Sequence, residues 1–170
     1  MPPDPSSSIF IILASLAASA FFSGMEIAYV SSNKIHIEIE KKQAGLLSKL
    51  LTKITAKPSK FIATMLIGNN IALVIYGFYM GDVLVDWLVT HLSASSILVN
   101  ELSLLTQTVV STLVILVTAE FLPKVFFQIY ANSALKLFAA PAYVFYILFS
   151  VISAFVIWIT DVVLKYIFKT

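Results

Sequence analysis

Glu120 is the residue whose type and position most clearly predict chemistry in this chain. It lies at the end of an apolar run that begins at Leu113, and Pro123 follows three residues later. A carboxylate within a membrane is costly unless it meets a cation, so by default it marks a functional site. Because Pro123 has no N–H, the carbonyl oxygen of Ala119 loses its helical hydrogen-bond donor. Together, the carboxylate and this carbonyl oxygen predict a site for a hard cation.

A structural explanation of Glu120 stays open beside the cation site. Lys124 follows Glu120 by four residues, the spacing at which opposite charges pair on one face of a helix. In this interpretation Glu120 serves only to pair with Lys124, and no ion is bound.

Two further groups of polar residues interrupt apolar stretches of the chain. Ser23, Gly24 and Glu26 lie in the first stretch, whereas Asn69 and Asn70 lie near the middle of the second. Amides in hydrocarbon must hydrogen-bond between helices or coordinate a ligand, and a serine hydroxyl can bond back to its own helix. Taken singly, each of these residues is better explained by a structural hydrogen bond than by a ligand.

The depth of these residues favours a common site. At about 1.5 Å per residue, Ser23 lies roughly 12 Å and Asn69 roughly 14 Å from the cytoplasmic ends of their spans. Glu120 reaches a comparable depth only if its helix continues beyond Pro123, or if a water-filled vestibule opens from the cytoplasm. The site would then contain a hydroxyl, one or two amides, a carboxylate and the Ala119 carbonyl. Such oxygen donors suit Mg²⁺, Ca²⁺ or Na⁺ and disfavour soft metals.

The composition predicts an all-α integral membrane protein. Of 170 residues, 59% are hydrophobic and only 12% are charged, and the mean hydropathy is +0.96. The chain has no cysteine, and its two histidines, His36 and His91, are far apart, which disfavours zinc or copper sites. The sequence contains no Ser/His/Asp set, HExxH motif or paired catalytic carboxylates, so we expect no enzyme, and we expect no nucleic-acid partner.

The spans and their orientation follow from hydropathy and lysine placement. We expect transmembrane helices over about residues 9–30, 61–81 and 98–122, and amphipathic cytoplasmic helices over about 33–57. Seven lysines lie between the first and second spans, whereas the segment 82–100 contains none. The positive-inside rule therefore places the N-terminus outside and the lysine-rich segment in the cytoplasm.

A fourth apolar stretch, residues 143–164, has lysines on both sides. Lys124 and Lys136 precede it, while Lys165 and Lys169 follow it. We therefore favour a helical belt over residues 124–168 that lies along the cytoplasmic face, re-enters, or packs under the bundle. A simple four-span topology remains the alternative.

Two patterns predict contacts with lipid and with other helices. A lysine stripe and an apolar stripe predict an interfacial helix, separated near Gly45 from the helix before it, that either binds anionic lipid or merely sets topology. The stripe consists of Lys42, Lys49, Lys53, Lys57 and Lys60. In the first span, Ala14 with Ala18 and Ser15 with Ser19 allow close helix approach, in a dimer or within the chain.

Four short motifs, in the same order along the chain, resemble the transmembrane domain of the CorC/cyclin M (CNNM) family of magnesium transporters. The first two are Phe22-Ser-Gly-Met-Glu-Ile-Ala28 and Ser32-Asn-Lys34. The others are Ile67-Gly-Asn-Asn70 and Glu120-Phe-Leu-Pro-Lys124. The chain departs from the family pattern at Ala119, where glycine is usual, and at Leu73, where relatives often carry asparagine.

The resemblance implies a fold, an ion and an assembly. It implies three spans with the N-terminus outside and the C-terminus cytoplasmic, a juxtamembrane helical belt, and a homodimer in the plasma or inner membrane. It also implies Mg²⁺ export, coupled to Na⁺ entry. Relatives carry a cytoplasmic pair of CBS domains, which this sequence lacks; we therefore expect a single transmembrane domain over residues 1–170 that ends artificially at Thr170. The family's ion site transfers to Ser23, Asn69 and Glu120, with Gly24, Asn70 and Ala119 adjacent and with Glu26 and Lys124 as secondary candidates.

The leading functional hypothesis is therefore a Mg²⁺ transporter whose site removes most or all of the ion's water. The alternative is a regulatory or scaffold membrane protein that senses Mg²⁺ and modulates a separate transporter. Flux through liposomes that contain only this protein discriminates between the two, because a sensor needs a partner.

Overall fold

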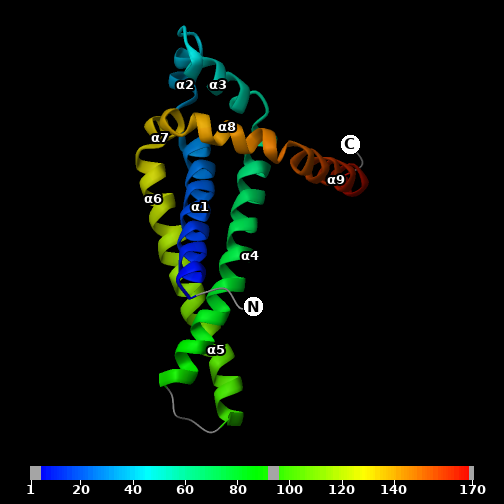
Figure 1. The fold of residues 1–170 in the computed structure, drawn as a ribbon. Coiled ribbons are helices and arrows are strands. Elements are labelled where there is room, and N and C mark those ends of the chain that lie inside the picture. The colour runs from blue at the N-terminus through cyan, green and yellow to red at the C-terminus, as the bar shows by residue number, and fades with distance from the viewer. Residues whose placement is uncertain (1–4, 92–95, 169–170) are drawn as a thin grey trace.

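The computed structural model describes residues 5–91 and 96–168, and all the elements in those ranges are helices (Figure 1). The first part of the chain contains α1 (Pro5–Ser31), α2 (Lys34–Lys41), α3 (Leu46–Thr55) and α4 (Pro58–His91). The second part contains α5 (Ser96–Ile115), the π-helix η1 (Leu116–Phe121), α6 (Leu122–Ile129), α7 (Ala131–Leu137), α8 (Ala139–Leu148) and α9 (Ser150–Phe168). The all-helical prediction is confirmed for the described residues.

Three long rods form the body of the molecule. Figure 1 shows α1 and α4 rising beside a third rod made of α5, η1 and α6. Helices α7 and α8 cross one end of these rods, α2 and α3 lie beyond them, and α9 points away to the side. Helix α1 packs against α4, η1 and α6, so it is the central element on which the other rods assemble.

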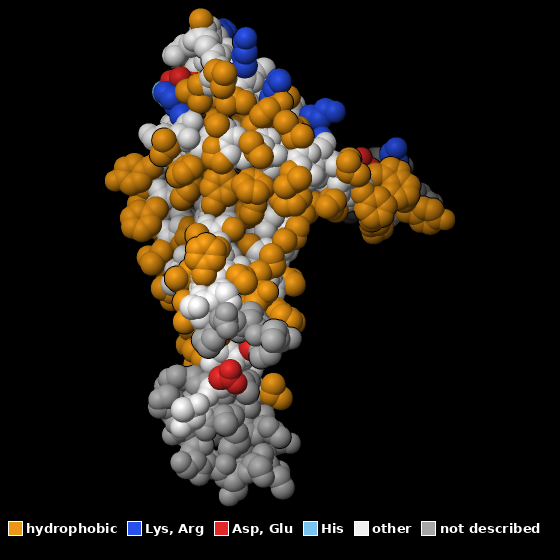
Figure 2. All heavy atoms as spheres, viewed as in Figure 1, with side chains coloured by type: hydrophobic (Ala, Val, Ile, Leu, Met, Phe, Trp, Pro, Cys, Tyr) orange, Lys and Arg blue, Asp and Glu red, His pale blue; other side chains and the backbone are white. Residues whose placement is uncertain are grey.

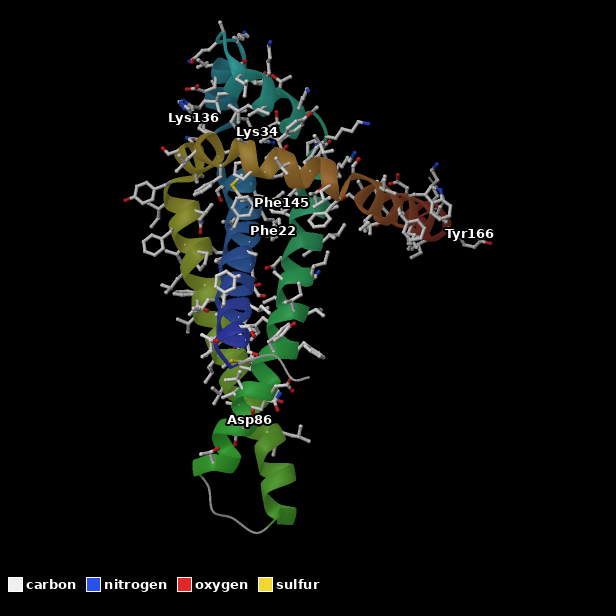
Figure 3. The ribbon with its side chains drawn as sticks, viewed as in Figure 1. Phe22, Lys34, Asp86, Lys136, Phe145 and Tyr166 are labelled. Carbon is white, nitrogen blue, oxygen red and sulfur yellow. The ribbon has the colours of Figure 1, made fainter. Side chains whose placement is uncertain are left out.

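Aromatic side chains fill the core where α8 crosses the bundle. The rings of Phe22 on α1 and Phe145 on α8 meet edge to face, with centroids 4.8 Å apart (Figure 3). Gly68 on α4 lies directly against Phe22, because a Cβ there would be 2.5 Å from a ring carbon. Lipid is as apolar as these side chains, so close packing around small residues, rather than hydrophobic burial, holds such helices together.

The two short helices beyond the bundle are amphipathic, as predicted. The Asn33 side chain accepts hydrogen bonds from the first N–H groups of α2, and Gly45 separates α2 from α3 with a φ of 140°. Leu51 and Ile54 of α3 are buried. The predicted single lysine stripe is wrong: α3 carries only Lys49 and Lys53, while the other lysines of the stripe are distributed over the end of α2, the α3–α4 connection and α4.

An ion pair that the sequence analysis did not predict joins α2 to α7. Lys136 Nζ lies 2.7 Å from Glu40 Oε1, and the Asn33 backbone N–H donates to Asn132 Oδ1 at 2.9 Å. Glu40 is nearly buried, so its charge requires this partner. The pair ties the α2–α3 segment to α7, the helix that follows the third rod.

Four helical segments of the described chain are long and apolar enough to cross a membrane. They are Ser6–Ser31, Pro58–Leu84, Leu104–Ile129 and Ser150–Ile167. The predicted count of three is therefore not confirmed, and the third segment ends at residue 129 rather than 122. The stretch 143–164 is divided between α8 and α9, and α7 and α8 meet at a bend of 66°.

Charged residues lie at both ends of the molecule, in addition to those within the rods. Lys34 and Lys136 lie at the end formed by α2, α3 and α7, whereas Asp86 lies near the opposite end (Figure 3). On the face shown in Figure 2, lysines gather at the first of these ends, and hydrophobic side chains cover the rods below it. The expected external segment 82–100 is helical up to residue 91 and again from residue 96, and residues 92–95 lie outside the described part.

Candidate metal centre

Two hydrogen bonds bring the predicted ligands of three separate rods together. Ser23 Oγ on α1 donates to the carbonyl oxygen of Ala119 in η1 at 2.7 Å. Asn69 Nδ2 on α4 donates to Glu120 Oε1 at 3.1 Å. Ser23, Asn69 and Ala119 are buried. Hydroxyl, amide, carbonyl and carboxylate groups therefore meet where α1, α4 and η1 face one another.

The π-helix explains how Ala119 presents its carbonyl oxygen. Pro123 cannot donate to residue 119, and the surrounding helix widens so that the Leu122 N–H bonds to Val117 O, five residues back. Such π-helical turns are frequent at functional sites because they re-aim backbone and side-chain groups. The Ala119 carbonyl, deprived of its usual donor, instead receives the Ser23 hydroxyl.

Helix α6 gives Glu120 the depth that a common site requires. Helical structure continues beyond Pro123 to Ile129, so Glu120 lies nine residues from the end of its apolar segment. At about 1.5 Å per residue this is roughly 14 Å, similar to the depths of Ser23 and Asn69. The first of the two arrangements considered from the sequence is thus the one observed.

Ser19 is a member of the cluster that the sequence analysis missed. Its Oγ donates to Asn69 Oδ1 at 2.5 Å, and Ser19 is fully buried. The Asn69 amide therefore has its oxygen held by α1 and its nitrogen directed at Glu120. The sequence indicates Ser19 only as a small residue, yet it lies one helical turn before Ser23 and thus faces the same neighbours.

Lys124 and Glu26 complete the charged part of the cluster. The Lys124 ammonium pairs with Glu120 Oε2, so the ion pair considered from the sequence is present in this structure. Glu26, one turn beyond Ser23 on α1, lies close enough to interact electrostatically with both Lys124 and Glu120. Lys124 thus pairs with Glu120 and has the second carboxylate, Glu26, in its neighbourhood.

Gly24 and Asn70, the adjacent predicted positions, differ in their surroundings. Gly24 lies against the ring of Phe127 on α6, and a Cβ there would be 2.6 Å from that ring. This glycine allows the close approach of α1 and α6 beside the site. Asn70 is exposed, and its side chain makes no hydrogen bond with any residue that the structure describes.

The donor set limits the cations that could bind. Within residues 5–91 and 96–168, no three His, Asp or Glu side chains gather into a metal site. Neutral oxygens with one nearby carboxylate suit a hard cation and give no thiolate or imidazole to a soft one. The groups that meet here are thus neutral oxygen donors beside one carboxylate, and that carboxylate pairs with the Lys124 ammonium.

A family model described as the cyclin M transmembrane N-terminal domain matches residues 10–169. The chain belongs to this family. The match spans all the rods and α9, so the cluster around Glu120 lies inside a cyclin M transmembrane domain.

Two curated relatives indicate the wider setting of this cyclin M domain. It is similar to the polyamine export protein of Salmonella typhimurium strain 14028s, with 36% identity over 76 residues, 45% of this chain and 17% of the relative. It is also similar to the UPF0053 inner membrane protein YfjD of Escherichia coli K12, with 31% identity over 112 residues, 66% of this chain and 24% of the relative. The chain therefore spans less than a quarter of each relative. Family and relatives together support a membrane location and a role related to membrane transport.

Proposed function

We propose that this cyclin M domain exports Mg²⁺, coupled to Na⁺ entry, through a site made of Ser23, Asn69, Glu120 and the Ala119 carbonyl. The observation that carries the proposal is the meeting of these groups from three rods at one depth. Ser23, Ala119 and Glu120 present oxygen, Asn69 carries an amide oxygen that now accepts from Ser19, and Glu120 adds a full negative charge. Mg²⁺ gives up its water reluctantly, so a compact oxygen site with a carboxylate is the least that could replace it.

The hydrogen bonds in this structure indicate how these groups would rearrange to bind a cation. Ser23 Oγ and Ala119 O are 2.7 Å apart, and both oxygens retain lone pairs that could face a cation between the rods. A rotation of the Asn69 amide, which gives up the hydrogen bond from Ser19, would present oxygen in place of nitrogen to the position beside Glu120. The bound cation would thereby replace the hydrogen bonds that join these groups in this structure.

Flux into liposomes that contain only the purified domain tests this proposal. We expect Mg²⁺ to move down its gradient, with the rate altered by an opposing Na⁺ gradient. A Mg²⁺ sensor that regulates a separate transporter would bind the ion and show no flux without its partner. Glu120→Gln liposomes are the control, because their flux should fall to the level of empty vesicles.

An organic polyamine is a second candidate substrate, and one contact favours it. The Lys124 ammonium on Glu120 is an alkyl ammonium bound to the site carboxylate, the same contact that one end of a polyamine would make. The Salmonella relative is named for polyamine export. Spermidine flux measured in the same liposomes, alone and in competition with Mg²⁺, distinguishes the two substrates.

We further propose that α7, α8 and α9 form a belt at the cytoplasmic membrane surface. Figure 1 shows α9 directed sideways from the bundle, and in Figure 2 its charged side chains lie on the side of the lysine-rich end. Lys57 and Lys60 share an open pocket with Trp158 and Asp161 of α9, which is suited to the headgroup level of a membrane.

Cysteine labelling tests this orientation, and the chain contains no native cysteine to remove. Cysteines at Lys53 and Lys165 should react only with a reagent added from the cytoplasmic side. A cysteine at Asp82 should react only from outside. Labelling of Lys165→Cys from outside would mean that α9 crosses the membrane.

We also propose a homodimer as the functional assembly. Ala14 and Ala18 line an open apolar groove with Gly68 and Ala72 of α4, and small residues of this kind let a second helix approach closely. A disulfide between two copies of the Ala14→Cys variant in membranes would support this interface.

A further inference from the structure

Lys124 is unusual because its own positively charged ammonium is paired with Glu120, the carboxylate that we propose as a ligand of the transported cation. Its ammonium pairs with Glu120 Oε2, while Asn69 Nδ2 donates to the other carboxylate oxygen. Both Glu120 oxygens are therefore engaged by donors in this structure. A cation cannot use Glu120 as a ligand at Oε2 unless the Lys124 ammonium leaves.

Glu26 offers the ammonium a second carboxylate. It lies on α1, one turn beyond Ser23, and Ser23 contacts the residue adjacent to Glu120. Both Lys124 and Glu120 interact electrostatically with Glu26, whereas no ion pair between Glu26 and any residue of the described chain is present. Lysine is suited to such an exchange, because its ammonium is a point charge on a flexible four-carbon stem.

We propose that Lys124 is a tethered competitor of the transported cation: it holds Glu120 when the site is empty and moves towards Glu26 when an ion binds. This inference rests on the proposed function, since it assigns Lys124 a role at the same site. It explains why a cation site contains a lysine, because a transporter must bind its ion weakly enough to release it. Return of the ammonium to Glu120 favours that release.

The exchange also predicts how the net charge of the cluster affects its affinity for Mg²⁺. Glu26, Glu120 and Lys124 together carry a charge of −1 when all are ionised. Removal of Lys124 leaves −2 beside the bound ion, which favours Mg²⁺ more strongly than the wild-type cluster does. Lys124 thus lowers the affinity of the site, and Glu26 limits this reduction by accepting the displaced ammonium.

Mg²⁺ titrations of the full chain in detergent test the proposal, with affinity read by calorimetry. We expect Lys124→Met to bind Mg²⁺ about tenfold more tightly than wild type, the size typical of coupled charges in contact. Lys124→Arg, which keeps the charge, should bind no more tightly than wild type. Glu26→Gln should weaken binding in the wild-type background, because the displaced ammonium then has no carboxylate to receive it.

A double-mutant cycle separates exchange from a general effect of charge. If Lys124 moves to Glu26, Glu26→Gln should have a much smaller effect on affinity in the Lys124→Met background. An equal effect of Glu26→Gln in both backgrounds would overturn the exchange. Unchanged or weaker Mg²⁺ binding by Lys124→Met would overturn the competition, provided that Glu120→Gln abolishes binding. Retained binding by Glu120→Gln would instead overturn the site itself.

Discussion

Glu120→Gln should abolish the stabilisation of this domain by Mg²⁺ while leaving it folded. The substitution keeps the shape of the side chain and its hydrogen bond with Asn69, but it removes the charge that a dehydrated Mg²⁺ requires. A ligand at one hundred times its Kd stabilises the folded state by about 2.7 kcal/mol, so the loss is large. Thermal unfolding of the purified chain, with and without Mg²⁺, measures it.

Lys124→Met is the matched control for this prediction. This substitution leaves Glu120 without its ion-pair partner, so we expect a lower melting temperature in the absence of Mg²⁺. The increase in melting temperature caused by Mg²⁺ should be as large as in wild type or larger. If the two residues serve only to neutralise each other, neither variant should show a change in its response to Mg²⁺. A full Mg²⁺ shift in Glu120→Gln would direct the search for the ion to Glu26.

Gly68→Ala should destabilise the bundle by about 1–3 kcal/mol, the usual cost of overpacking a tight core. A Cβ at this position would lie 2.5 Å from the ring of Phe22. That ring cannot move away easily, because it packs against Phe145 on α8 and Phe149 at the C-terminal end of α8. Because Gly68 directly precedes Asn69, the displacement should also weaken Mg²⁺ binding. Denaturation in detergent and a Mg²⁺ titration measure the two effects.

Gly77→Ala on the same helix is the control for Gly68→Ala. Nothing lies within 4 Å of a Cβ at residue 77 among the described residues, so alanine there should be neutral or stabilising by up to about 1 kcal/mol. Equal destabilisation by both substitutions would mean that helix flexibility, and not the contact with Phe22, explains the effect.

Several features followed from the sequence because they depend on local physics. Composition predicted a helical membrane protein, since only hydrogen-bonded helices can run through lipid without exposing backbone groups. Pro123 predicted that the Ala119 carbonyl loses its helical donor, because a missing N–H acts on a residue at a known spacing, whereas the π-helix was not predicted. The depths of Ser23 and Asn69 followed from the helical rise alone. These residues were therefore placed at one level before any packing was known.

Tertiary structure decided which of these groups come into contact and which partners they bind. The sequence left two interpretations of Glu120, and the structure shows the Lys124 pair and the Asn69 contact together, because a carboxylate has two oxygens. Ser19 could not be recognised as a partner of Asn69, since a serine in an apolar helix has the same sequence pattern whether it packs or donates. The break of residues 143–164 into α8 and α9 also lacked a local signal. It depends on how α8 packs its aromatic side chains across α1, a contact between segments more than a hundred residues apart.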